Sequence, residues 1–232
     1  MEEKMNSLKK TARIAGLLYV LMSIQAPIAL IYVPSHIMIE GNAAATTNNI
    51  HVHEFLFRLS IISQFISTIM FVLLAFVLCR LLRQVNQYQA KLLVVFVVVQ
   101  VPIVFLLETF KFTSLMIANG EILQTAQTEQ KQDLTILLLN MHSYGIMTLE
   151  IFWGLWLIPF GQLVYNSGFI PRILGLCLFL GGIGWITSSV MFLLFPAYHP
   201  FVSQYIKVTG AIGEFPIMLW LLIKGVRVRK SQ

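Results

Sequence analysis

Charged side chains are scarce in this sequence, and their scarcity excludes an ordinary water-soluble domain. Only 11% of the 232 residues are charged and 57% are hydrophobic, whereas soluble domains carry about 25% charged residues. Cysteine is scarce as well, because the chain has Cys79 and Cys177 alone. Two cysteines do not make a zinc site. We expect both in a reducing compartment, which disfavours a disulfide.

Recognised catalytic and nucleotide-binding motifs are missing too. The sequence has no His-Glu-x-x-His helix, no Gly-x-Ser-x-Gly elbow, no P-loop and no cysteine cluster. It also has no paired-aspartate motif for binding a metal–diphosphate. We therefore assign no catalytic residue, no metal site and no cofactor, and we favour a protein that is not an enzyme.

Long apolar runs dominate what is present. A transmembrane helix needs roughly 20 mostly apolar residues, and six such runs lie near residues 12–34, 54–82, 91–118, 134–166, 171–195 and 204–226. The connections are too short for a soluble domain. We predict an all-α polytopic membrane protein with six transmembrane helices, in which residues 1–232 form a single integral membrane domain. We also expect the first run to be an uncleaved helix rather than a signal peptide.

Basic residues gather at one side of these runs. Twelve of the 16 lie in segments that we place inside, namely Lys4, Lys9, Lys10, Arg13, Arg80, Arg83, Lys91, Arg172, Lys224, Arg227, Arg229 and Lys230. Cytoplasmic loops of membrane proteins carry an excess of Lys and Arg, so we place both termini in the cytoplasm. The net charge of +6 then orients the protein and contacts anionic lipid head groups, rather than nucleic acid.

Short matches between the runs indicate internal repetition. Residues 62–65 (Ile-Ser-Gln-Phe) resemble residues 212–215 (Ile-Gly-Glu-Phe), and residues 25–27 (Gln-Ala-Pro) resemble residues 100–102 (Gln-Val-Pro). These matches suggest three helical hairpins arranged as repeats. The polar corner at residues 165–172 joins one hairpin, and its two spans are rich in glycine, which permits close helix packing.

Polar side chains inside the spans predict the functional site. Ionisable residues are costly in hydrocarbon and usually face the bundle interior or a wet cavity. Counted from the predicted inner ends, Arg58, Lys111 and His142 lie near the outer boundary, and Glu150 and Glu214 lie nearest the middle. We therefore expect a polar cavity that opens to the outside. Its ligand-binding residues would be Arg58, Gln64, Gln100, Glu108, Lys111, His142, Glu150 and Glu214.

Several of these residues also have a simpler interpretation. Glu108 and Lys111 stand three residues apart, and such pairs stabilise a helix modestly. Arg58 can extend to the outer head groups, and His142 fits a hydrogen-bonded histidine better than a metal ligand. Glu150 and Glu214 are the hardest to dismiss, because carboxylates at this depth mark proton or ligand relays.

Residues 161–175 (Gly-Gln-Leu-Val-Tyr-Asn-Ser-Gly-Phe-Ile-Pro-Arg-Ile-Leu-Gly) resemble the signature of a bacterial membrane family known as a domain of unknown function. Residues 10–19 and 213–225 resemble the two ends of that family, so the similarity spans essentially the whole chain. The resemblance implies six helices in a bacterial cytoplasmic membrane. It implies no activity and supplies no catalytic residues.

These observations favour a small membrane protein that binds or transports a small polar or amphiphilic ligand through the cavity. Arg58 and Lys111 would attract an anionic group, and Glu150 and Glu214 would couple it to protons. Two alternatives stay open: an intramembrane enzyme for lipid or isoprenoid substrates, with a midplane Glu as general acid or base, and a regulatory or immunity protein that acts by helix contacts. The expected partners are membrane lipids and a small-molecule or lipid ligand.

Overall fold

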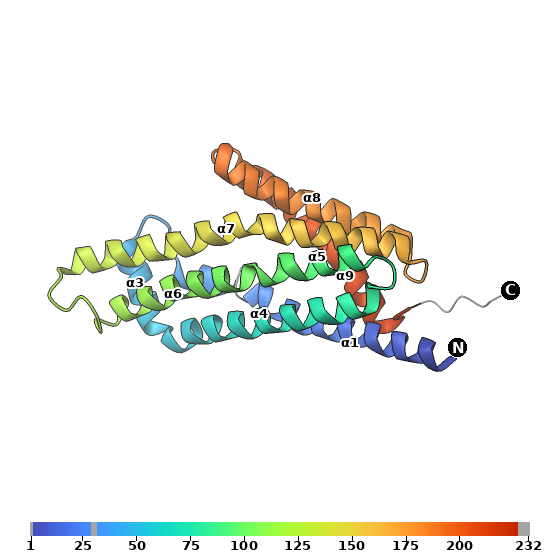
Figure 1. Ribbon diagram of the computed structural model, residues 1–232. Helices are drawn as coiled ribbons and strands as arrows, with labels where there is room; N and C mark the ends of the chain where they lie inside the picture. Colours follow the sequence, from blue (N-terminus) through green and yellow to red (C-terminus); the bar gives the residue numbers. More distant parts are fainter. Residues whose placement is uncertain (1, 29–31, 227–232) are drawn as a thin grey trace. The chain divides into compact units, whose positions relative to one another are not determined.

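The structure is a computed structural model that describes residues 2–28 and 32–226, apart from the side chains of residues 2–5, 26, 27 and 207. Within this part of the chain the secondary structure is helical (Figure 1). The elements of this part are α1 (Glu2–Pro27), α2 (Val33–Ile37), α3 (Ala43–Val52), α4 (Glu54–Leu82), α5 (Gln87–Val98), α6 (Gln100–Ala118), α7 (Thr128–Ser167), α8 (Arg172–Leu194) and α9 (His199–Ile223). The predicted all-α class is confirmed.

Five helices of the described chain are long and apolar enough to cross a membrane. They are α4, α5 together with α6 (Gln87–Ala118), α7, α8 and α9. The sequence analysis predicts six spans, and the first of them, residues 12–34, is not among the five. The helix α1 begins with a polar segment and ends at Pro27, and residues 29–31 lie outside the described part. A crossing by this first run stays a prediction.

Prolines account for two of the differences between the predicted runs and the observed helices. The last helix begins at His199, earlier than predicted, because Pro200 falls in its first turn, where the missing N–H costs no helical hydrogen bond. Pro102 lies inside the predicted third run, where its missing N–H and its ring disturb the preceding helical turn. The predicted third run accordingly divides into α5 and α6. Residues 34–53, which connect the first two predicted runs, contain most of α2 and all of α3.

The contacts divide the chain into two compact units. Unit 1 comprises Met1–Leu21, Met70–Gln100 and Met147–Gln232, and unit 2 comprises Met22–Ile69 and Val101–Ile146. The helices α1, α4, α6 and α7 contribute residues to both units, α6 through Gln100 alone to unit 1. Because each unit is assembled from segments far apart in the sequence, neither is a separable stretch of the chain.

Glycines determine how α7 and α8 pack in unit 1. A Cβ on Gly154 would overlap the carbonyl oxygen of Gly182, and a Cβ on Gly161 would lie 2.9 Å from the carbonyl oxygen of Gly175. The two pairs run in opposite directions along the helices, so α7 and α8 form an antiparallel hairpin. Gly168, with φ +71°, lies in the corner in a left-handed conformation that glycine adopts readily. The predicted close packing of these two spans is confirmed.

The last helix, α9, packs against both α8 and α1 within unit 1. A Cβ on Gly16 would overlap the backbone of Leu222, and further along the helices the Tyr19 hydroxyl meets the Glu214 carboxylate. The order of these contacts shows that α1 and α9 run antiparallel. The start of α1 and the end of α9 therefore lie at the same end of unit 1.

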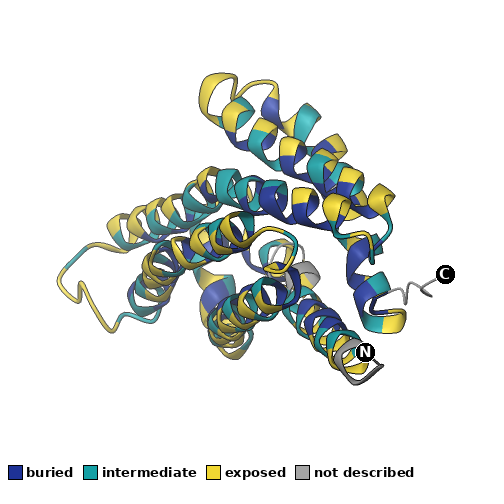
Figure 2. Cartoon of the chain, turned by 45° about the vertical axis from the view of Figure 1, so that its right-hand side comes forward, coloured by how far each residue is buried: buried dark blue, intermediate teal, exposed yellow. Residues whose placement is uncertain are grey.

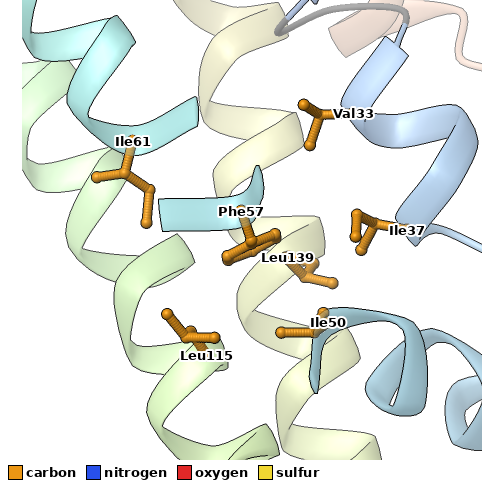
Figure 3. Close-up of a cluster of buried hydrophobic side chains, with 7 residues drawn as sticks. All are labelled: Val33, Ile37, Ile50, Phe57, Ile61, Leu115 and Leu139. Atoms are coloured by element: carbon orange, nitrogen blue, oxygen red, sulfur yellow. The ribbon is translucent and has the colours of Figure 1, made fainter. Parts of the chain in front are cut away.

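A cluster of buried apolar side chains holds unit 2 together (Figure 3). Its members come from α2, α3, α4, α6 and α7, and they are Val33, Ile37, Ile50, Phe57, Ile61, Leu115 and Leu139. The short helices α2 and α3 thus cover the ends of three long helices with apolar residues. This core fixes the rotation of α4, α6 and α7 about their axes.

Burial alternates around the long helices, so that one face is buried and another is exposed (Figure 2). The exposed faces carry large apolar side chains, for example Ile62, Ile66 and Ile69 on α4, each more than half exposed. A water-soluble protein rarely exposes apolar surface on this scale. Lipid chains are the solvent that suits such faces.

Candidate functional site

Three of the predicted site residues meet in unit 2: Glu108 and Lys111 on α6, and His142 on α7. The Nε2 atom of His142 lies 3.0 Å from Oε1 of Glu108, and Nζ of Lys111 lies 4.0 Å from Oε2 of the same carboxylate. The side chain of Glu108 is 2% exposed, that of Lys111 9% and that of His142 18%. We call these three residues the Glu108 cluster.

Apolar packing positions the Glu108 cluster. Leu139, one helical turn before His142, belongs to the core of unit 2, as does Phe57 (Figure 3). The Lys111 ammonium lies 5.3 Å from the centre of the Phe57 ring, a cation–π distance. Beside the cluster, Gly145 on α7 lies against the side chain of Leu107, so α6 and α7 approach closely here. The simple i,i+3 pair expected from the sequence is therefore part of a larger arrangement.

One oxygen of the Glu108 cluster is not hydrogen-bonded within the described part of the chain. That atom is Oε2 of Glu108, which is fully buried, and its distance of 4.0 Å from Nζ of Lys111 is too long for a hydrogen bond. A buried polar atom left in this way costs about 1–3 kcal/mol. A small group that donates a hydrogen bond to Oε2 and accepts one from Nζ would give each of these two atoms a hydrogen-bond partner.

A second carboxylate, that of the half-buried Glu214 on α9, lies in unit 1. The Tyr19 hydroxyl donates a hydrogen bond to its Oε2 at 2.5 Å, and Nε1 of Trp185 donates to its Oε1 at 3.3 Å. Trp185 in turn meets Trp153 edge-on at 5.2 Å between ring centres. Both oxygens of Glu214 therefore have a donor within unit 1.

Tyr19 and Trp185 were not among the predicted site residues. In the sequence, Tyr19 and Trp185 both lie within apolar runs. The signal available was their chemistry, because a tyrosine hydroxyl or an indole N–H inside a span needs a hydrogen-bond acceptor. The sequence does not say which acceptor each of them meets.

The glutamines differ in what they contact. Gln25 on α1 donates to the side-chain oxygen of Gln64 on α4 at 3.2 Å, within unit 2. Ser67, one turn further along α4, donates to the carbonyl oxygen of Met22 at 3.1 Å. A polar face of α4 thus lies against α1. Gln100 instead donates to the carbonyl oxygen of residue 96 in the preceding turn, at 2.7 Å, which satisfies it locally.

Arg58 lies at the start of α4 in a network of exposed charges. Its Nε is 2.6 Å from Oε1 of Glu54, and its guanidinium is 3.8 Å from Glu121. The side chain amide of Asn119 donates to the other oxygen of Glu54 at 2.9 Å. The side chain of Arg58 is 40% exposed. Two carboxylates therefore offset the charge that was expected to attract an anionic ligand.

The eight predicted residues are divided between the units. Arg58, Gln64, Glu108, Lys111 and His142 belong to unit 2, whereas Gln100, Glu150 and Glu214 belong to unit 1. Glu150 is half-buried on α7. The structure brings the Glu108 cluster together and gives Glu214 donors of its own. The convergence of Glu150 and Glu214 on a shared polar interior stays a prediction.

Two hollows occur in unit 1, away from the predicted site residues. One, of about 230 Å³, is lined by Val85, Asn86, Gln89, Gln162, Leu163 and Asn166. The other, of about 670 Å³, lies along the start of α1. Within the described residues, no three His, Cys, Asp or Glu side chains are placed to hold a metal ion together.

Comparison with known proteins places the chain in a family but assigns it no activity. An uncharacterized protein of Archaeoglobus fulgidus is 36% identical over 83 residues, which is 35% of this chain and 48% of that protein. The match therefore spans about half the length of the relative. No solved structure matches the chain. A family model described as a domain of unknown function (DUF4386) matches residues 14–225, which confirms the resemblance inferred from the sequence. The chain belongs to the DUF4386 family.

Proposed function

We propose that this membrane protein binds a small polar or amphiphilic ligand at the Glu108 cluster. The observation that carries the proposal is Oε2 of Glu108, a buried carboxylate oxygen with no hydrogen bond from the described residues. It lies 4.0 Å from the Lys111 ammonium. Residues of this kind inside a span are costly to maintain, so a binding role accounts for their presence better than packing does.

The charges of the cluster define the chemical class of the ligand. The carboxylate of Glu108 offsets the positive charge of Lys111, so the site does not favour a strong anion. A neutral hydroxyl or primary amide group donates one hydrogen bond and accepts another, which matches Oε2 and Nζ. The aromatic face of Phe57 beside Lys111 suits an apolar portion of the same ligand.

We further propose that binding serves transport across a bacterial cytoplasmic membrane, with Glu150 and Glu214 exchanging protons. The cost of carboxylates inside spans supports this role for the two acids. The clustering of basic residues in the segments predicted inside supports the location.

The experiment measures thermal unfolding of the full chain in detergent with hexan-1-ol and with hexanamide. A ligand at 100 times its Kd adds about 2.7 kcal/mol to the free energy of unfolding. We expect at least one probe to stabilise the unaltered protein. This stabilisation should disappear in Glu108→Gln and in Lys111→Met, which remove one partner each.

The control is Glu129→Gln, which changes an exposed carboxylate in the first turn of α7. It should respond to the probes like the unaltered protein, because it lies outside the cluster. If neither probe stabilises the unaltered protein, or if all variants respond equally, the Glu108 cluster is not the binding site.

A further inference from the structure

A shallow groove runs along the start of α1 in unit 1, with a volume of about 670 Å³. Its lining divides into two chemical halves. The basic half consists of Lys9, Lys10 and Arg13, and the apolar half consists of Ile14, Leu17 and Leu222; the polar Asn6 completes the lining. All the charged residues that line the groove are basic.

The two halves follow one another along a single helical face. Lys10, Arg13, Ile14 and Leu17 stand at positions i, i+3, i+4 and i+7 of α1, which lie on the same side of a helix. From Lys10 to Leu17 the helix rises by about 10 Å, at 1.5 Å per residue. Charge thus gives way to apolar surface over a distance comparable to a lipid head group and the first part of its chain.

The groove is open on one side and firmly backed on the other. Ile14 is 43% exposed and Leu17 is 50% exposed, so both are free to contact a lipid. Behind them, Gly16 lies against the backbone of Leu222, and the Arg13 guanidinium donates to the carbonyl oxygen of Ile223 at 3.4 Å. The contact between α1 and α9 therefore holds the lining residues in place.

We propose that this groove is a binding site for an anionic phospholipid. The phosphate contacts Lys9, Lys10 and Arg13, and the first part of one acyl chain lies along Ile14, Leu17 and Leu222. A zwitterionic lipid would bring its own positive charge to the basic half, whereas an anionic lipid does not. Basic residues next to an apolar helical face are the usual means of recognising anionic lipids.

The test is native mass spectrometry of the purified full chain in detergent, with phosphatidylglycerol and phosphatidylcholine of identical acyl chains. We expect phosphatidylglycerol to bind at least ~10-fold more tightly. Each basic residue near an anionic surface contributes roughly fivefold. The variant Lys9→Gln/Lys10→Gln/Arg13→Gln should therefore lose at least ~10-fold of this preference.

The matched control removes the same charge elsewhere in unit 1, through Arg80→Gln/Arg83→Gln/Lys91→Gln, all exposed residues. It should keep the preference. Equal losses in the two triple variants would mean that overall charge attracts the lipid, and an unchanged preference in the groove variant would place the lipid elsewhere. Either outcome overturns the proposal.

Three further measurements decide the result if the groove variant does not fold. Lys9→Arg/Lys10→Arg/Arg13→Lys retains the charge and should retain the preference, and its loss contradicts the proposal. Leu17→Asn should weaken the binding of phosphatidylglycerol. Water-soluble glycerol phosphate should compete poorly with the lipid; if it competes equally, the groove binds a free phosphate and the lipid proposal fails.

Discussion

At the scale of single residues, the acids Glu108 and Glu214 have different surroundings. Glu214 accepts hydrogen bonds on both carboxylate oxygens, from Tyr19 and Trp185. Glu108 has His142 at one oxygen and the more distant Lys111 ammonium at the other. In a medium of low dielectric constant a satisfied polar group rigidifies its neighbours, whereas an unsatisfied one is costly. The contacts of Glu214 therefore also stabilise the packing around it, whereas the incomplete contacts of Glu108 are the ones on which the proposed ligand binding rests.

The hydrogen bond between Tyr19 and Glu214 predicts the result of one substitution. Tyr19→Phe removes the hydroxyl donor and leaves Oε2 of Glu214 without this partner. A buried polar atom that loses its partner costs about 1–3 kcal/mol, so we expect the free energy of unfolding to fall by that amount. Thermal unfolding of the full chain in detergent measures the change.

The control for this substitution is Tyr88→Phe, because the Tyr88 side chain is exposed and its hydroxyl should contribute little. A double-mutant cycle with Glu214→Gln gives the coupling between the two residues. Neighbours that share a hydrogen bond couple by about 0.5–3 kcal/mol. Additive losses would show that Tyr19 does not act through Glu214.

At the scale of elements, glycines set the distance between helices. Glycine lowers the stability of an isolated helix, yet α8 contains four buried glycines, Gly175, Gly181, Gly182 and Gly184. Helices in lipid gain little from hydrophobic association and depend on close packing instead. The missing side chains let α8 approach α7 and α9 closely.

Gly175 tests this account. A Cβ there would lie 2.7 Å from the carbonyl oxygen of Gly161 and 2.8 Å from the backbone nitrogen of Tyr165, and backbone atoms cannot move aside as side chains do. We expect Gly175→Ala to lower the free energy of unfolding by about 1–3 kcal/mol. In an isolated helix the same change would stabilise the helix by about 1 kcal/mol. A loss of stability would therefore identify the close contact with α7, rather than helix propensity, as the cause.

Leu176→Ala is the matched control, because Leu176 is the next residue of α8 and is 50% exposed. It should alter the thermal unfolding of the detergent-solubilised protein by less than about 0.5 kcal/mol. A Gly175→Ala protein as stable as the unaltered one would show that α7 and α8 pack less tightly than the contacts indicate.

At the scale of the whole molecule, the arrangement in the membrane follows from the number of crossings. Five described helices qualify as spans, and the basic residues predict that both termini are cytoplasmic. An even number of crossings is needed for both termini to lie on one side. The prediction therefore requires the first run to cross as well.

Single cysteines placed in a Cys79→Ser/Cys177→Ser protein test this arrangement in intact cells. An impermeant maleimide should label Glu40→Cys and Gln127→Cys directly, and Asn6→Cys only after the membrane is permeabilised. All three positions are exposed. Labelling of Asn6→Cys and Glu40→Cys from the same side would mean that the first run does not cross the membrane.

Helix content and the approximate extent of the spans were available from the sequence. The run at residues 54–82 matches α4 (Glu54–Leu82), and the run at 171–195 matches α8 (Arg172–Leu194). The acids Glu108 and Glu214 were recognised as unusual from position alone. Two of the boundary errors lie near Pro102 and Pro200. Pro102 lies inside a predicted run and divides it, whereas Pro200 lies in the first turn of a helix and is compatible with its start.

The sequence by itself determined the helical class and the membrane as solvent, because hydrophobicity and helix length are properties of a local stretch of chain. The contacts of Glu108 with His142, and of Glu214 with Tyr19 and Trp185, were decided by the tertiary structure. These pairs depend on how far each helix is rotated about its axis and shifted along it. Rotation and shift come from packing between segments distant in sequence, such as the glycine contacts of α7 with α8 and the apolar core around Phe57.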